Sequence, residues 1–245
     1  MRVLAVFAHP ERQSFCGAVL DRFTAGLKEA GHEVEVADLY GEKFDPVFTP
    51  ADSAFFLDDS VPESVLEEMQ LKAKAVQLAG GPLRRMVARR FLKDKGVREI
   101  ARLGYGTRPK DVLREQARVS RADGLAFIAP VYWLGFPAIL KGWVERVFTY
   151  GFAYRLTPEG WKGDIRGRIP LLRQSKALLV STTFFSQADY SAGLRDAMEL
   201  VVDSWGFKFP GIKTVDHRYF WAVPSVGADV RKRYLDDAHQ LGLGY

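Results

Sequence analysis

The chain has 245 residues, of which 47% are hydrophobic and 27% charged, and its net charge is +5. These proportions are ordinary for a globular protein and exclude the disordered and fibrous classes. No window approaches the roughly 18 uninterrupted apolar residues of a membrane span, and the N-terminal apolar run is too short for a signal peptide. A single cysteine excludes an internal disulfide, so we expect a cytoplasmic protein.

The positive charge is concentrated between Arg84 and Arg121, where thirteen Lys and Arg residues accompany four Asp and Glu residues. Such a segment can attract an anionic cofactor, nucleic acid, a membrane surface or an acidic partner. It contains neither aromatic-interleaved strands nor zinc-ligand spacing, which disfavours nucleic acid. The simpler interpretation is a solvated helix face.

Strand and helix patterns alternate along the chain. The expected strands cover residues 2–8, 32–38, 124–129, 176–182 and 208–215. The expected helices cover 15–30, 137–150, 191–205 and 226–241, and a Gly- and Pro-rich loop covers 151–170. From about 50 to 120 the periodicity is helical, with breaks at Gly80-Gly81-Pro82 and at 104–109.

This alternation predicts an α/β fold, because right-handed crossovers bury a parallel sheet under helices on both faces. Five strands suggest a flavodoxin-like, doubly wound sheet with the order 2-1-3-4-5. The stretch of about 50–120 lacks a strand pattern and has few apolar anchors. We therefore expect one domain over 1–245 with a helical insertion between strands two and three.

In this strand order, the loops that leave strands one, three and four meet at one edge of the sheet. The first loop precedes a helix N-terminus, which favours an anion. Ser14 and the amides of Phe15 and Cys16 can donate to a phosphate, and His9 and Arg12 can add charge-assisted bonds. The alternative is that Ser14 only caps the helix. The loop is neither a Walker A sequence nor a G-x-G-x-x-G turn.

The third-strand loop can hold a flat ligand. Tyr132 and Trp133 can pack beside an aromatic ring system, and the backbone N–H groups from Trp133 to Gly135 can donate to its heteroatoms. Gly135 lets the backbone approach the ligand closely. A flat, redox-active ligand with a phosphate indicates a flavin. The alternative is an ordinary connection whose aromatic residues pack in the core.

The chain resembles the NAD(P)H:quinone oxidoreductase family of flavodoxin-like flavoproteins over nearly its whole length, except about 55–107. The most specific part is the block 137–154, which includes Pro137-Ala138-Ile139-Leu140-Lys141-Gly142-Trp143 and Gly151-Phe152-Ala153-Tyr154. The other matching residues are His9, Ser14-Phe15, Phe44-Asp45-Pro46, Glu115-Gln116, Ala122-Asp123, Pro130, Trp133-Leu134-Gly135, Thr182-Thr183 and Tyr190.

The resemblance implies a role for each of these loops. His9, Ser14, Phe15 and Cys16 would hold the flavin phosphates, Pro130, Val131, Tyr132, Trp133, Leu134 and Gly135 would line the isoalloxazine ring, and Thr182 and Thr183 would lie against its other side. Tyr154 and Tyr190 would bound the pocket shared by nicotinamide and acceptor, as the candidate catalytic residues. Gln116 looks like a structural residue.

The implied activity is hydride transfer from NADPH or NADH, through flavin N5, to a quinone or a similar electron-poor small molecule. FAD is the first choice of cofactor and FMN the second, and the resemblance also implies a homodimer with the flavin near the subunit boundary. One alternative is a redox-sensing ancillary subunit that docks on a membrane protein through the basic segment. The other is a flavodoxin-type electron carrier.

Two departures from the family pattern concern the acceptor side. Phe184-Phe185 stands where the better-known members carry a glycine pair, so we expect a narrowed or reshaped acceptor pocket. The histidine that usually follows the loop tyrosine has no counterpart after Tyr190, which removes the expected Tyr-His proton relay. His217 is expected to pack structurally, and the alternative is that it reaches the partner's active site. Cys16 is expected to pack within its helix, and the alternative is a pKa lowered by the helix N-terminus. No metal cluster, paired-carboxylate site or Ser/His/Asp triad is evident in the sequence.

Overall fold

A computed structural model describes residues 1–245. Its main sheet has five parallel strands in the order β2-β1-β3-β6-β7. The strands are β1 (Arg2–Phe7), β2 (Glu33–Asp38), β3 (Gly124–Pro130), β6 (Lys176–Thr182) and β7 (Thr214–Phe220). This is the predicted 2-1-3-4-5 order, renumbered because a separate hairpin of β4 (Tyr154–Leu156) and β5 (Arg168–Pro170) precedes β6. The predicted α/β fold is confirmed.

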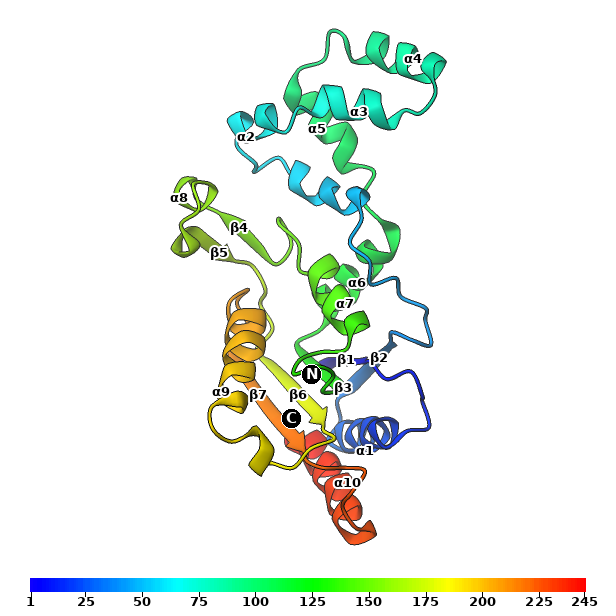
Figure 1. Cartoon of the computed structure of the whole chain (residues 1–245), viewed down its shortest axis with the longest axis vertical. Coiled ribbons are helices and arrows are strands. Elements are labelled where there is room, and N and C mark those ends of the chain that lie inside the picture. Colours follow the sequence, from blue (N-terminus) through cyan, green and yellow to red (C-terminus); the bar gives the residue numbers. More distant parts are fainter.

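Helices cover both faces of the sheet (Figure 1). One face packs against α1 (Phe15–Glu29) and α10 (Ala228–Leu243), and the other against α6 (Lys110–Arg121), α7 (Ala138–Val147) and η4 (Leu200–Lys208), the π-helical continuation of α9 (Leu194–Glu199). Alternate strand residues separate the two cores. Val3, Ala5 and Phe7 of β1 face α1, whereas Leu4 and Val6 face α7.

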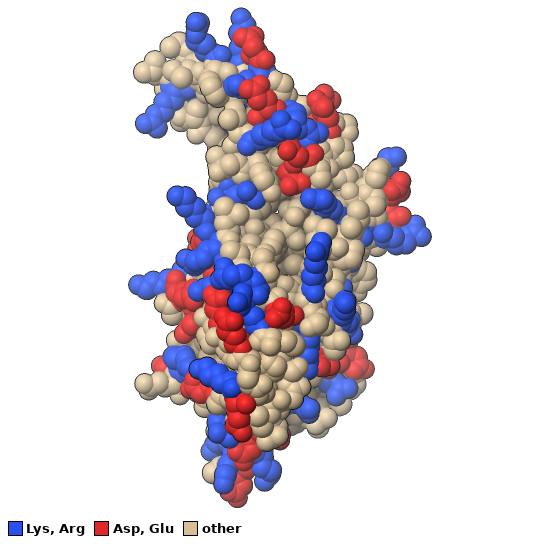
Figure 2. Space-filling view, turned by 180° about the vertical axis from the view of Figure 1, so that it is seen from behind, with Lys and Arg blue, Asp and Glu red and all other residues tan.

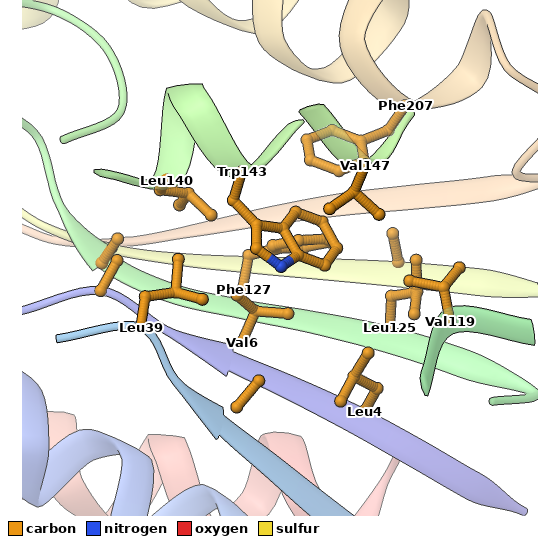
Figure 3. Close-up of a cluster of buried hydrophobic side chains, with 14 of the residues drawn as sticks. Leu4, Val6, Leu39, Val119, Leu125, Phe127, Leu140, Trp143, Val147 and Phe207 are labelled. Carbon is orange, nitrogen blue, oxygen red and sulfur yellow. The ribbon is translucent and has the colours of Figure 1, made fainter. Parts of the chain in front are cut away.

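Trp143 of α7 lies at the centre of the larger core (Figure 3). Its ring meets Phe127 of β3 edge to face, with the centroids 5.8 Å apart, and it is fully buried. The indole N–H donates to the buried Glu115 carboxylate at 3.1 Å, which satisfies the one polar atom of the side chain. Arg114 and Arg118 in turn bind the other oxygen of Glu115.

The segment between β2 and β3 is helical, as its periodicity predicts. It contains η1 (Pro50–Leu57), α2 (Glu63–Glu68), α3 (Leu71–Leu78), α4 (Pro82–Leu92), α5 (Val97–Tyr105) and α6. The predicted break at Gly80-Gly81-Pro82 separates α3 from α4, because Gly80 has a φ of +90° and Pro82 opens the next helix. Helices α2 to α5 extend away from the sheet (Figure 1). None of the helices combines the length and the apolar character that crossing a bilayer requires.

A buried ion network fastens this segment to the main core. Arg146 of α7 donates to Asp52 of η1 at 2.9 Å, to Asp111 of α6 at 2.7 Å and to the Asp45 carbonyl at 2.6 Å. The Arg146 and Asp52 side chains are 4% and 0% exposed. Burial raises the pKa of Asp52, but hydrogen bonds from Thr49 and Arg146 outweigh burial, so the net pKa is lowered.

Two expected elements differ from the structure. The fifth strand runs over Thr214–Phe220 and not 208–215, because residues up to Lys208 continue the π-helical turns of η4. Within the expected loop 151–170, the chain forms β4, the short helix α8 (Pro158–Trp161), the 3-10 turn η2 (Ile165–Gly167) and β5. Short strands of three residues leave too little periodicity to be recognised in the sequence.

We predict that Asp52→Asn lowers the free energy of unfolding by about 3 kcal/mol at pH 7, because it leaves the buried Arg146 guanidinium short of a charge partner. Urea denaturation measures this change. The lowered pKa of Asp52 means that its contribution is present above about pH 4, the ordinary range of an aspartate, and is lost as the pH falls through the folded-state pKa. The difference between wild type and variant should therefore shrink below pH 4.

The matched control is Glu145→Gln, which removes the exposed ion pair with Lys141 on the same helix. Exposed i,i+4 pairs contribute about 0.5 kcal/mol or less. Equal destabilisation by the two variants would contradict the anchoring role of Asp52.

Candidate functional site at the carboxyl edge of the sheet

The register of the parallel strands brings the three predicted loops to one edge. Phe7 pairs with Ile128 and Pro130 pairs with Thr182 in neighbouring strands. The Val131 N–H donates to the Thr182 carbonyl at 2.9 Å, so the loops after β3 and β6 start side by side. The edge is therefore a continuous row of loop starts, and its side chains can act on one ligand.

The N-terminus of α1 leaves two backbone donors free. The Ser14 hydroxyl caps the helix by accepting from the Gly17 N–H at 3.2 Å, whereas the amides of Phe15 and Cys16 donate no hydrogen bond within the chain. His9 Nδ1 lies 3.0 Å from the Glu11 nitrogen, which leaves its Nε2 atom free. Arg12 instead pairs with Asp21 at 2.5 Å, which neutralises its charge. An anion bound at this end would accept hydrogen bonds from the two amides and would lie near His9, whereas Arg12 is already paired with Asp21.

Cys16 is buried, as helix packing predicts, and the alternative of a lowered pKa is wrong. The side chain is 2% exposed and lies beside Thr182 at the end of β6. Burial raises the pKa of the thiol to about 12, and the hydrogen bond with Thr182 only partly offsets this effect. The effect of burial on the Cys16 pKa is therefore larger than that of the helix N-terminus. The contact between Cys16 and Thr182 links the first loop to β6, the fourth predicted strand.

The loop after β3 is a tight turn from Tyr132 to Gly135. The Tyr132 N–H donates to the Gly135 carbonyl at 3.0 Å and the Gly135 N–H donates to the Tyr132 carbonyl at 3.1 Å. Trp133 and Leu134 between them have φ values of +49° and +64°, the left-handed pair of a type I′ turn. Each costs about 1–2 kcal/mol for a residue with a side chain.

This strained turn exposes the groups that the sequence indicated as ligand-binding. Trp133 is fully exposed, and the amides of Trp133 and Leu134 donate to nothing in the chain. The Gly135 amide is occupied by Tyr132, so only two of the three expected donors are free. Open space lies where Gly135 lacks a Cβ atom. Backbone strain at a site of free donors is typical of a ligand-binding loop.

The phenol of Tyr132 lies between the loops. Burial is the largest cause of its raised pKa. The proximity of Tyr40, just after β2, and of Cys16 raises this pKa further. In the loop after β6, the buried Thr183 hydroxyl donates to the Phe185 carbonyl at 2.7 Å and accepts from the Ala222 amide at 3.0 Å. Thr183 therefore shapes this loop, while Phe184 and Phe185 expose 67% and 56% of their surface beside it.

Tyr190 belongs to an aromatic cluster at this same edge. It lies in the 3-10 turn η3 (Ala188–Tyr190), is 4% exposed and packs with its ring centroid 5.1 Å from that of Trp221. Tyr219 and Val131 join the cluster, so Tyr190 adjoins the loop after β3. Burial, followed by the charge of Asp189, raises the pKa of Tyr190. A hollow of about 540 Å³ opens beside it, lined by residues from Gln187 to Asp196.

Ser181, His217 and Asp203 form a triad-like network that the sequence did not reveal. His217 Nε2 lies 2.8 Å from the Ser181 hydroxyl, and Nδ1 lies 3.0 Å from Asp203 and 3.0 Å from the Tyr219 hydroxyl. The rings of His217, Tyr219 and Trp221 stack along one face of the β7 chain, at centroid distances of 4.0 and 4.6 Å. The signal in the sequence is their spacing of two residues, which places all three on one side of a strand.

The network positions side chains and does not form a hydrolytic site. Ser181 is buried in β6, whose backbone groups are hydrogen-bonded to β3 on one side and to β7 on the other. Its hydroxyl is therefore not open to a substrate. The network joins β6, β7 and η4, and it supports the stack on which Tyr190 rests.

Tyr154 lies away from this edge within one chain. Tyr154 is the first residue of β4. The carbonyl of the preceding residue, Ala153, accepts a hydrogen bond from the amide of Leu171, a residue that comes before the start of β6 in the chain. The seven residues of β6 span about 20 Å, so Tyr154 and Thr182 are at opposite ends of that strand. Figure 1 shows the β4–β5 hairpin far from the end of β6. Burial is the largest cause of the raised pKa of Tyr154, and the nearby Tyr150 raises this pKa further.

The sheet order and the loops at its carboxyl edge define a flavodoxin-like protein. A family model described as flavodoxin-like fold matches residues 1–241, and the chain belongs to this family. Within it, the chain is a member of the NAD(P)H:quinone oxidoreductases, as the two following similarities show.

The chain is 31% identical over 238 residues to NAD(P)H dehydrogenase (quinone) 1 of Cavia porcellus, covering 96% of this chain and 73% of the relative. It superimposes on a NAD(P)H:quinone oxidoreductase from Methanothermobacter marburgensis with a TM-score of 0.69 and 30% identity, covering 99% and 98% of the two chains. An FMN-dependent NADH-azoreductase from Bacillus anthracis, solved in complex with FMN, shares the fold at 12% identity and a TM-score of 0.63, covering 98% and 97%. The protein is therefore an oxidoreductase, and the ancillary-subunit and electron-carrier alternatives are not favoured.

We predict that Cys16 in the folded protein is alkylated by iodoacetamide about 10³-fold more slowly at pH 8 than in the urea-unfolded chain, because a pKa of about 12 leaves little thiolate. Mass spectrometry of timed samples measures both rates. The raised pKa also means that the neutral thiol's contribution to stability is lost as the pH rises above about 8.5, its unfolded value. Comparable rates in the two states would show that the thiol is accessible and ionised.

Proposed function

We propose that the protein is a flavin-dependent oxidoreductase that takes hydride from NADPH or NADH and reduces a quinone or a similar electron-poor small molecule. The observation that carries the proposal is the pairing of two free amides at the α1 N-terminus with two free amides in the strained turn after β3, on adjoining loops. The first pair suits a phosphate and the second suits the heteroatoms of a flat ring.

The residues present fit a flavin. His9, Phe15 and Cys16 would hold the phosphate end, with Ser14 fixing the helix start, and the turn from Tyr132 to Gly135 would line the ring system. FAD is our first choice and FMN the second. The FMN named for the azoreductase neighbour keeps the second choice open.

The bound flavin would supply the redox chemistry, by accepting hydride from the nicotinamide and passing it to the acceptor. The chain's residues bind and orient. Trp133 and Tyr132 offer exposed aromatic surface for stacking, and the Trp133 and Leu134 amides orient the ring through hydrogen bonds. Phe184 and Phe185 add an exposed aromatic pair where the acceptor would enter.

A homodimer would reconcile the positions of the two candidate catalytic tyrosines. Tyr190 lies at the carboxyl edge and Tyr154 at the other end of β6, so one chain does not present both to one ligand. We propose that Tyr154 acts in the partner's site, with the flavin near the subunit boundary. The single reduced cysteine fits a cytoplasmic location, which we also propose.

We predict that the purified protein is yellow, that its released cofactor is FAD or FMN, and that NADPH or NADH bleaches it. Phe15→Pro then tests the phosphate site. Proline suits the first helical position, and the extended backbone of Ser14 is compatible with a following proline. Because Phe15→Pro and Phe15→Ala both lack the phenyl ring, their comparison isolates the loss of the free amide. Fluorescence titration of the apoprotein should show flavin binding at least about tenfold weaker than in the matched control Phe15→Ala, since hydrogen bonds to charged groups contribute about 1.5–3 kcal/mol.

Riboflavin, which has no phosphate, separates the two ends of the site. Its affinity should be the same for Phe15→Pro and Phe15→Ala. A colourless protein that binds no flavin on reconstitution would refute the proposed function, and an equal loss of riboflavin affinity would refute the phosphate assignment alone.

The dimer has its own test. Light scattering should give twice the 27.6 kDa chain mass. Tyr154→Phe should raise KM for the acceptor or lower kcat while flavin affinity stays unchanged, because the proposal assigns Tyr154 to the acceptor pocket and assigns flavin binding to the loops after β1 and β3. A monomer with full activity would exclude a shared site.

A further inference from the structure

The outer face of α4 exposes four apolar side chains, with the exposed Arg90 among them, and its one neighbour is the Lys95 ammonium 4.8 Å from the Phe91 ring centroid. Leu83, Met86, Val87 and Phe91 follow helical spacing and are 68%, 60%, 59% and 60% exposed. Leu92 lies half a turn from Leu83 and is only 5% exposed, so the opposite face holds the helix to the molecule. The four apolar side chains therefore point outward from the tip of the insertion, and they are not the edge of a core.

The same region is strongly cationic. We call residues 71–93, which contain α3 and α4, the α3–α4 hairpin. It holds seven cations and no Asp or Glu, and none of the seven forms an ion pair: Lys72, Lys74, Arg84, Arg85, Arg89, Arg90 and Lys93. Figure 2 shows Lys and Arg side chains projecting at the upper tip of the molecule.

Part of the rest of the basic segment is ion-paired, whereas Arg98 and Arg108 donate to backbone carbonyls and Lys110 forms no ion pair. Arg114, Arg118 and Arg121 of α6 pair with Glu35, Glu42 or Glu115, and Arg102 of α5 pairs with Asp59. The α3–α4 hairpin thus combines seven cations that form no ion pair with the exposed apolar face.

We propose that the α3–α4 hairpin docks the protein on an anionic phospholipid surface. A helix that lies in the plane of a bilayer buries apolar side chains at the headgroup boundary while its arginines meet the lipid phosphates. Leu83 and Val87 supply the first contact, and Arg84 and Arg89 border the apolar face on either side of the helix. One surface satisfies both chemistries at once.

Nucleic acid and a second copy of the chain each satisfy only one of them. Nucleic acid would neutralise the arginines but leave the four apolar side chains against a charged backbone. A second copy packed through the same face would bring seven cations against seven. The hairpin lies at the far end of the molecule from the α1 N-terminus and the end of β6 (Figure 1), so docking leaves the candidate site open and does not depend on the proposed function.

The experiment is flotation of the full-length protein with vesicles of phosphatidylcholine alone or with about 30% phosphatidylserine, at about 0.1 M salt. Binding is expected only with phosphatidylserine, and it should weaken at least about tenfold at about 0.5 M salt, where exposed charges are screened. Arg89→Gln/Arg90→Gln should weaken binding about 25-fold, since each basic residue near an anionic surface contributes about fivefold. Leu83→Ser/Val87→Ser should weaken it at least about tenfold through lost apolar burial.

The matched control is Lys232→Gln/Arg233→Gln, which removes two adjacent exposed cations from α10. This variant should bind like wild type, and circular dichroism should show all variants folded. Three results would overturn the proposal: equal binding to both vesicle types, equal losses in the control and the hairpin variants, or a hairpin variant that changes the mass measured by light scattering. The last result would assign the face to a second copy of the chain.

Discussion

The hydrogen-bonded register of β1, β3 and β6 is the constraint on which the candidate site depends. Because the strands are parallel and in step, three segments that are distant in sequence, ending at Phe7, Pro130 and Thr182, meet at one edge. Cys16 then touches Thr182, and Val131 binds Thr182 through its amide. No side chain of the site could meet another if one strand slipped by a residue, since the slip would also turn its core-facing residues outward.

The edge can carry unsatisfied groups because the sheet behind it is fully packed. The free amides at Phe15, Cys16, Trp133 and Leu134 are exposed or lie at a helix start, where a ligand or water can reach them. The left-handed backbone at Trp133 and Leu134 persists because β3 before it and α7 after it are buried. The two buried cores around Trp143 and Phe23 stabilise the sheet, and the groups that a ligand can reach lie at its carboxyl edge.

The insertion is joined to this rigid body by charge and not by a large core of its own. Its own buried cluster has four residues, one of which, Tyr150, comes from outside the insertion. Arg146 with Asp52 and Asp111 makes the main connection to α7. The arrangement separates two surfaces: the ligand-binding edge on the sheet, and the basic, apolar tip of α3–α4 at the far end of the molecule.

The alternation of apolar periods determined the α/β fold, the strand order and the helical nature of 50–120, because these patterns are local and strong. The loops at His9, Pro130 and Thr183 were also evident, since strand ends and turn residues mark them. Tertiary structure alone decided how each group behaves. Burial raised the pKa of Cys16, although the helix dipole favours the thiolate. Strand β7 begins after residue 213, which places His217 beside Ser181 and Asp203. The β4–β5 hairpin places Tyr154 at the other end of the sheet. These outcomes depend on packing between distant residues, which the order of residues along the chain does not display.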